Sequence, residues 1–156
     1  MIYNTEDNLN DKIDAEFISE KKTESIFGTT MARAAAVQSI YESEITKNYD
    51  SENIKNLKYY KSLNSSKKKM ALALFDYSIT NKIEIDKKIM KHIEDDNINR
   101  IPKTDLSILR MAVSELNTNI ETPVGVVVNE AVKLGNVFGS DSSKNFINGV
   151  LNSMVR

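Results

Sequence analysis

The chain has 156 residues, of which 40% are hydrophobic and 28% are charged, so we expect a folded globular domain with its own core. No apolar run approaches the roughly eighteen residues of a membrane span, and the acidic start lacks the basic and apolar regions of a signal peptide. The absence of cysteine excludes disulfides and thiolate metal sites and is compatible with the cytoplasm, where we expect this protein to act.

Residues 1–28 form an acidic, polar extension in front of the domain. They hold seven acidic residues and three lysines, a net charge of −4, which leaves +3 on residues 29–156 of a chain with net charge −1. Leu9, Ile13 and Phe17 recur at a spacing of four, which favours one amphipathic helix. The small apolar content equally favours a flexible segment. A mildly basic domain is compatible with a nucleic-acid ligand without requiring one.

The N-terminal half of the domain, from residue 29, has the pattern of three helices. Gly28 interrupts the chain, and Thr29 or Thr30 offers an N-cap for a helix from about Met31 to Thr46. A less regular helix covers residues 51–63. A longer helix is predicted over residues 67–93, because this segment contains no glycine or proline and follows a serine pair that suits an N-cap.

Three more helices are predicted in the C-terminal half. Pro102 suits the first turn of one that closes at residues 117–119, and Pro123 begins another that ends near Gly139. The valines at 126–128 alone would favour a strand, but the apolar residues beyond them continue at helical period. Residues 140–142 then cap a last helix. The sequence therefore predicts an all-α protein, a compact bundle of six to seven helices.

The sequence contains no recognisable catalytic motif. His92 is the only histidine, and one histidine without cysteine cannot build a hydrolytic triad of the usual type. The five glycines are isolated from one another, which argues against a P-loop or dinucleotide fingerprint, and the carboxylates show no metal-ligand spacing. We therefore expect a protein that is not an enzyme and needs no cofactor or metal.

Three segments, in this order, resemble the NusB family. Residues 32–41 are similar to the opening helix of that family, A-R-x-x-A-x-Q-x-L-Y, and residues 108–116 are similar to its I-L-R-x-A-x-x-E-L segment. Residues 122–151 resemble the series P…I-N-E-A-V-x-L…F-G…F-V-N-G-V-L at the same spacing. The resemblance covers residues 30–156 and leaves the extension outside.

The resemblance implies a NusB-like fold of two packed helical subdomains and a binding function without turnover. Proteins of that family pair with NusE, a ribosomal small-subunit protein, and the pair binds the single-stranded boxA element of nascent RNA. Binding helps RNA polymerase to read through terminators, notably in ribosomal RNA operons. The expected partners are therefore boxA RNA, NusE and the antitermination complex of RNA polymerase, and a homodimer is left open.

The resemblance also implies which residues touch RNA, which is held by cations at its phosphates and by aromatic faces at its bases. Arg33 is the first candidate for a phosphate contact, although a solvated helix arginine explains it equally well. Lys144 and Asn145 lie in the first turn of the last helix, where backbone N–H groups favour an anion. Phe146 is either a core residue or an edge residue that also reaches RNA. Tyr41 is mainly core, with its hydroxyl at the rim.

For the protein partner, the resemblance points to Asp105 as an acidic position that faces NusE. Alternatively, its carboxylate only stabilises the N-terminus of a helix. Asn129 and Glu130 are predicted to be a structural pair that caps or bonds neighbouring backbone, and Gly149 is predicted to allow close helix packing.

The chain departs from the family pattern in its basic residues. Arg33 stands almost alone at the opening, and asparagines occupy positions 136 and 145, where the family often has basic residues. Unaided RNA affinity should therefore be weaker and less dependent on salt. Lysines 67–69 are a candidate compensation, although such a run is usually only solvated. One further hypothesis is that the acidic extension competes with RNA for the basic face.

Two other functions are compatible with the same elements. A helical domain of this kind also forms the N-terminal part of some ribosomal RNA methyltransferases, but those proteins continue into a glycine-rich cofactor domain for which the chain up to Arg156 leaves no room. The alternative to antitermination is therefore such an RNA-binding domain without catalysis, or a helical scaffold that self-associates through apolar faces.

Overall fold

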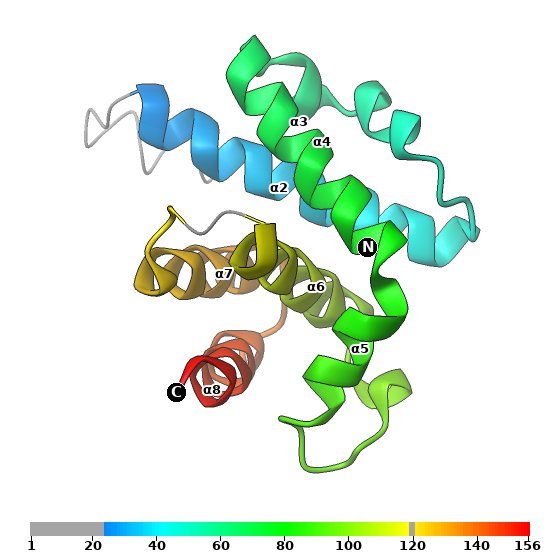
Figure 1. Cartoon of the computed structure of the whole chain (residues 1–156), viewed down its shortest axis with the longest axis vertical. Helices are drawn as coiled ribbons and strands as arrows, with labels where there is room; N and C mark the ends of the chain where they lie inside the picture. Colours follow the sequence, from blue (N-terminus) through cyan, green and yellow to red (C-terminus); the bar gives the residue numbers. More distant parts are fainter. Residues whose placement is uncertain (1–23, 119–120) are drawn as a thin grey trace.

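A computed structural model describes residues 24–118 and 121–156 of the chain (Figure 1). Within these ranges the chain forms helices and no strand, which confirms the predicted all-α class. The extension up to residue 23 lies outside the described residues. The helices, with η for 3-10 turns, are α2 Glu24–Thr46, η2 Ser51–Asn56, α3 Lys58–Lys61, α4 Ser65–Thr80, α5 Lys82–Met90, η3 Ile98–Arg100, α6 Lys103–Thr118, α7 Val124–Phe138 and α8 Ser143–Val155.

The helices form two packed subdomains, as expected. In the first, α2 packs against η2, α3 and α4, and in the second α6 packs against α5, α7 and α8. Figure 1 shows the first group above the second, and α2 and α4 both contact α6 where the groups meet. None of the helices in the described ranges combines the length and the apolarity that crossing a bilayer requires.

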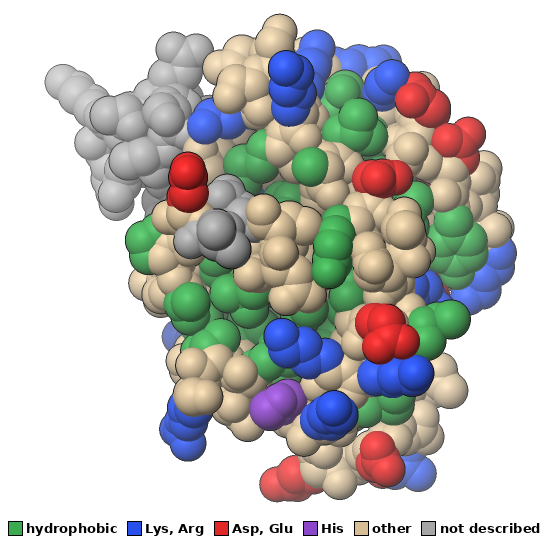
Figure 2. Space-filling model, in the orientation of Figure 1, with side chains coloured by type: hydrophobic (Ala, Val, Ile, Leu, Met, Phe, Trp, Pro, Cys, Tyr) green, Lys and Arg blue, Asp and Glu red, His purple; other side chains and the backbone are tan. Residues whose placement is uncertain are grey.

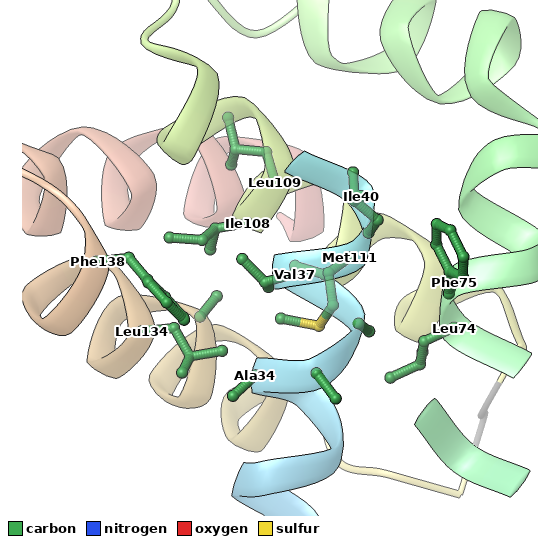
Figure 3. Packing of buried hydrophobic residues seen from close by; sticks show 14 of the residues in the cluster. Ala34, Val37, Ile40, Leu74, Phe75, Ile108, Leu109, Met111, Leu134 and Phe138 are labelled. Carbon is green, nitrogen blue, oxygen red and sulfur yellow. The ribbon is translucent and has the colours of Figure 1, made fainter. Parts of the chain in front are cut away.

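The core is continuous across both subdomains and is centred on α6. Every residue from Asp105 to Glu115 is buried, so α6 is surrounded on all sides. Figure 3 shows core side chains of α2, α4, α6 and α7 converging around Val37 and Met111. Small side chains let α2 approach its neighbours closely, because four alanines are fully buried along it, at positions 32, 34, 35 and 36.

A buried ion pair fixes α5 against α6. Arg110 Nε donates to Asp86 Oδ1 and Arg110 Nη2 donates to Asp86 Oδ2, both at 2.8 Å. The same guanidinium reaches Glu44 of α2 at 3.4 Å. Only 3% of Arg110 is exposed, so its charge depends on these carboxylates rather than on water.

The predicted start of the first helix near Met31 is wrong, because α2 begins at Glu24 and continues through Gly28. The Thr30 hydroxyl does not cap the helix and instead donates to Glu130 Oε1 of α7 at 2.9 Å. Gly28 serves close packing, since a Cβ at this position would lie 3.2 Å from Lys67 Cγ of α4. Gly28 and Thr30, which the sequence pattern suggested as the start of a helix, therefore lie inside α2 and form its contacts with α4 and α7.

Two of the predicted helices are divided. The segment over residues 67–93 breaks at Asn81, which separates α4 from α5 and whose side-chain amide donates to the Tyr77 carbonyl at 3.0 Å. The weaker helix over residues 51–63 becomes η2 and the single turn α3. The cap of α4 is Asn64 rather than a serine, because its side chain accepts from the Lys67 N–H.

In the C-terminal half the prediction is confirmed, including a helix rather than a strand at residues 126–128. Gly139 follows α7 as predicted, but for a different reason. Its φ of −91° is open to any residue. A Cβ at Gly139 would lie 2.5 Å from Ser143 Cβ and 2.8 Å from the Gly135 carbonyl oxygen, so the α7–α8 turn leaves no room for a side chain.

We expect Gly139→Ala to lower the free energy of unfolding by about 1–3 kcal/mol, because the added methyl group must displace α8 from α7. Gly125→Ala is the matched control, since a Cβ there meets nothing within 4 Å. That change should be neutral or stabilising by at most about 1 kcal/mol. Urea unfolding of the two variants measures both values, and equal stabilities would contradict the packing account.

Candidate functional site

An open pocket of about 610 Å³ lies between the segment after α5, the start of α6 and the first turns of α8. It brings together three residues that the sequence assigned separately, namely Asp105, Asn145 and Phe146. Its remaining lining comes from both sides of the opening: His92, Ile93, Glu94, Asp95, Asn97, Arg100, Ile101, Pro102, Ser142, Gly149 and Val150. We call it the α6–α8 pocket.

Asp105 lies at the base of the α6–α8 pocket with only 3% of its surface exposed. Its carboxyl is hydrogen-bonded to Ser143, the first residue of α8, and Oδ1 has no hydrogen-bond partner among the described residues. Burial raises the pKa of the Asp105 carboxyl, and the Ser143 hydrogen bond only partly opposes this change. A buried carboxylate with one unsatisfied oxygen at a pocket is suited to accept from a cationic side chain.

The pocket has an acidic character. Glu94, Asp95 and Asp105 supply carboxylates, and Arg100 is the single permanent cation among the described residues that line it. Arg100 Nη1 is already paired with Asp95 Oδ2 at 2.9 Å. The excess of carboxylates attracts a basic protein segment and repels the phosphates of a nucleic acid.

The first turns of α8 hold the three candidate RNA residues, of which Asn145 and Phe146 line this pocket and Lys144 does not. Phe146 is partly buried against the core and also lines the pocket, so it is an edge residue of the core, and its contact with RNA stays a prediction. Lys144 and Asn145 are exposed. Ser142 occupies the N-cap of α8 but makes no side-chain cap hydrogen bond. A base could therefore stack on the accessible side of Phe146 with a phosphate near Lys144.

Gly149 also lines the α6–α8 pocket, and its predicted role is wrong. A Cβ at Gly149 would meet no atom within 4 Å, so this glycine allows no close helix packing. Close packing between α7 and α8 instead depends on Gly135, where a Cβ would lie 2.7 Å from Ile147 Cδ1. The missing side chain at Gly149 keeps the pocket open.

The structure does not place Arg33 where the prediction needs it. Its side chain is buried, with Nε and Nη2 each 2.7 Å from an oxygen of Glu115, and Nη1 is 3.2 Å from Glu130 Oε1. The guanidinium is thus enclosed by α2, α6 and α7, so a buried ion pair replaces the predicted phosphate contact. Glu130 is structural, as predicted, but it bonds the side chains of Thr30 and Arg33 rather than neighbouring backbone.

The other candidate residues lie away from the pocket or at its edge. Tyr41 is partly buried on α2, packs against the core and does not line the α6–α8 pocket. Asn129, the predicted partner of Glu130, is exposed. His92 lies at the pocket edge with its Nδ1 2.9 Å from the Ser153 hydroxyl. Among the described residues, no group of histidines and carboxylates is arranged to hold a metal ion.

Comparison with known proteins gives one consistent result. The model of the NusB family matches residues 30–156. The chain is 34% identical over 129 residues to the transcription antitermination protein NusB of Acetivibrio thermocellus, which covers 83% of this chain and 89% of that protein. It is 35% identical over 129 residues to the protein of the same name from Finegoldia magna, covering 80% and 91%.

Solved structures agree with the sequence comparisons. NusB of T. maritima superposes with a TM-score of 0.74 at 25% sequence identity, covering 81% of this chain and 89% of that chain. A crystal structure of the antitermination factors NusB and NusE in complex with double-stranded RNA gives a TM-score of 0.72 at 26% identity, covering 81% and 95%.

We expect Arg33→Ala to destabilise the protein by about 3–5 kcal/mol, because it leaves the Glu115 carboxylate buried without its cation and removes one of the two cations that pair with Glu130. Arg33→Lys should also lose stability, since an ammonium cannot bind Glu115 through two parallel hydrogen bonds. Lys144→Ala is the control and should leave the unfolding midpoint unchanged. If urea unfolding shows the Arg33→Ala variant to be as stable as the wild type, the buried ion pair of Arg33 does not stabilise the fold and this account is contradicted.

Proposed function

The chain belongs to the NusB family of transcription antitermination proteins, and from this premise we propose that it binds the boxA element of nascent ribosomal RNA together with NusE. In this role it promotes read-through by RNA polymerase within an antitermination complex in the cytoplasm. It acts through binding surfaces alone, without turnover, metal or cofactor.

One observation supports this function above the others: the residues suited to a basic protein and those suited to RNA meet at a single pocket. Asp105 is at its base, and Asn145 and Phe146 are at the rim. A basic segment of NusE seated over Asp105 would bring its own cations next to the first turns of α8. RNA at Phe146 would then touch both proteins.

The acidic lining gives a reason for RNA binding to depend on the protein partner. Without NusE, the carboxylates of Glu94, Asp95 and Asp105 lie next to the expected path of a polyanion and oppose its binding. A basic partner that neutralises them removes this repulsion and adds phosphate contacts. The two ligands are therefore coupled, each increasing the affinity for the other.

The RNA contacts on this chain are proposed to be Lys144, Asn145 and Phe146, with Tyr41 as a candidate at the edge of α2. Lys144 contacts phosphate, and the partly exposed ring of Phe146 stacks on a base. Because Arg33 is enclosed in the core, it contributes to RNA binding only by holding α2, α6 and α7 in place. No described contact favours the methyltransferase-related or scaffold alternatives.

A short boxA-like RNA should bind severalfold more tightly in the presence of NusE, measured by fluorescence anisotropy at fixed salt. Lys144→Ala should weaken the ternary complex. It should also reduce the slope of the logarithm of affinity against the logarithm of salt concentration by about one. Lys55→Ala, an exposed lysine on η2, is the matched control and should have no effect on affinity. Equal RNA affinity with and without NusE would refute the proposed function.

Asp105→Asn should separate stability from partner binding. Burial raises the pKa of Asp105 in the folded state, so ionising this carboxyl lowers the free energy of unfolding. This loss develops as the pH rises from the unfolded-state pKa through the folded-state pKa. At neutral pH the variant should therefore be more stable by about 1 kcal/mol, with the gain vanishing in acid. Its affinity for NusE should fall at least about tenfold, since the pocket loses its buried charge.

The matched control for Asp105→Asn is Asp141→Asn, which neutralises an exposed acid in the loop before α8. It should change neither the unfolding free energy nor the affinity measured by calorimetric titration with NusE. Undiminished NusE binding by the Asp105 variant would show that the α6–α8 pocket is not the partner site, whatever its RNA affinity.

A further inference from the structure

A lysine cluster at the end of the molecule remote from the α6–α8 pocket has no role in the proposed function. Residues 57–75 contain five lysines and no acidic residue. Four of them, which we call the α4 lysine patch, are Lys61 at the end of α3 and Lys67, Lys68 and Lys69 in the first turns of α4. Figure 2 shows basic side chains gathered over this end, where Figure 1 places α3 and the start of α4.

The patch differs from the other lysines in its electrostatic surroundings. Five lysines elsewhere pair with an acidic residue three or four positions away along the chain, in the pairs Lys47–Glu44, Lys55–Glu52, Lys82–Asp86, Lys87–Glu84 and Lys133–Glu130. In the described part of the chain, no carboxylate forms an ion pair with a patch lysine; Lys68 lies over the Tyr60 ring at 5.6 Å. The concentrated positive charge is therefore left for an anionic group.

The anionic group with the shortest path to the patch is the acidic segment of the same chain. Residues 1–23 hold six acidic residues and three lysines, and they join the domain at the start of α2. Gly28, only four residues after Glu24, lies directly against the Lys67 side chain. The segment is thus tethered within about one helical turn of the patch, where an effective concentration in the millimolar range is expected.

We propose that residues 1–23 dock in cis on the α4 lysine patch through charge pairing. Each exposed pair contributes little by itself, but several pairs on one tethered segment act together at high effective concentration. The docked segment screens the patch from other polyanions. This inference stands independently of the proposed function.

The test uses the full chain, which has no cysteine of its own, with a single Asn10→Cys change carrying a nitroxide spin label. At low salt the label should show a slowly tumbling component in its electron paramagnetic resonance spectrum. That component should be lost at about 1 M salt, where the Debye length falls to about 3 Å. Its fraction should not change on dilution, because the docking is intramolecular.

The patch variant replaces the three lysines of α4 by glutamine, namely Lys67→Gln, Lys68→Gln and Lys69→Gln. It should lose most of the slow component at low salt. The control variant makes the same number of changes at Lys87 and Lys88 of α5 and at Lys91, the residue after it, and should keep the wild-type spectrum. Both variants lose three positive charges, so the comparison separates a local contact from an effect of net charge.

Three results would overturn the proposal. An unchanged spectrum in the patch variant would show that the segment docks elsewhere or not at all. An equal loss in both variants would mean that the segment responds only to overall charge. If the patch variant keeps the slow component but binds oligouridylate severalfold more weakly, the patch is an RNA surface instead.

Discussion

The structure depends on α6, a helix buried over eleven consecutive residues that nevertheless carries three ionisable side chains within that run, Asp105, Arg110 and Glu115. Arg110 and Glu115 cannot be enclosed without partners, because an unpaired buried charge costs several kcal/mol. Asp86 of α5 and Arg33 of α2 supply those partners, and Glu44 and Glu130 complete the two clusters. Apolar burial drives the collapse around α6, and the two arginines determine how α2, α5 and α7 are aligned along it.

This constraint also decides where binding can occur. Glu115 and Asp105 lie ten residues apart on α6, about 15 Å along the helix. At the Glu115 end the charges are paired within the core, whereas at the Asp105 end one carboxylate oxygen has no partner in the described part of the chain and lies beside an open pocket. The first turns of α8 add an accessible aromatic ring and a lysine there. One end of α6 therefore stabilises the fold, and the other is available to ligands.

The family resemblance implied the two subdomains. Helix period and turn residues predicted the all-α class and the C-terminal helices, because these features are local in sequence. They missed contacts between distant segments: Gly28 and Thr30 looked like a helix start, although they face Lys67 and Glu130. The same limit applies at the site. The family resemblance implied roles for Asp105 and Phe146 separately but not their common pocket, and it assigned Arg33 to RNA. A lone arginine among buried alanines, with glutamates in two later helices, was the available signal of a core ion pair.

Amide hydrogen exchange of the free protein and of its complex with NusE and boxA RNA tests most directly whether binding is confined to the Asp105 end of α6. Complex formation should slow exchange in residues 92–106 and 142–149, which surround the α6–α8 pocket. Residues 30–36 around Arg33 should exchange as in the free protein, since their contacts are already made in the core. Slowing centred on residues 30–36, with the pocket segments unchanged, would contradict this account.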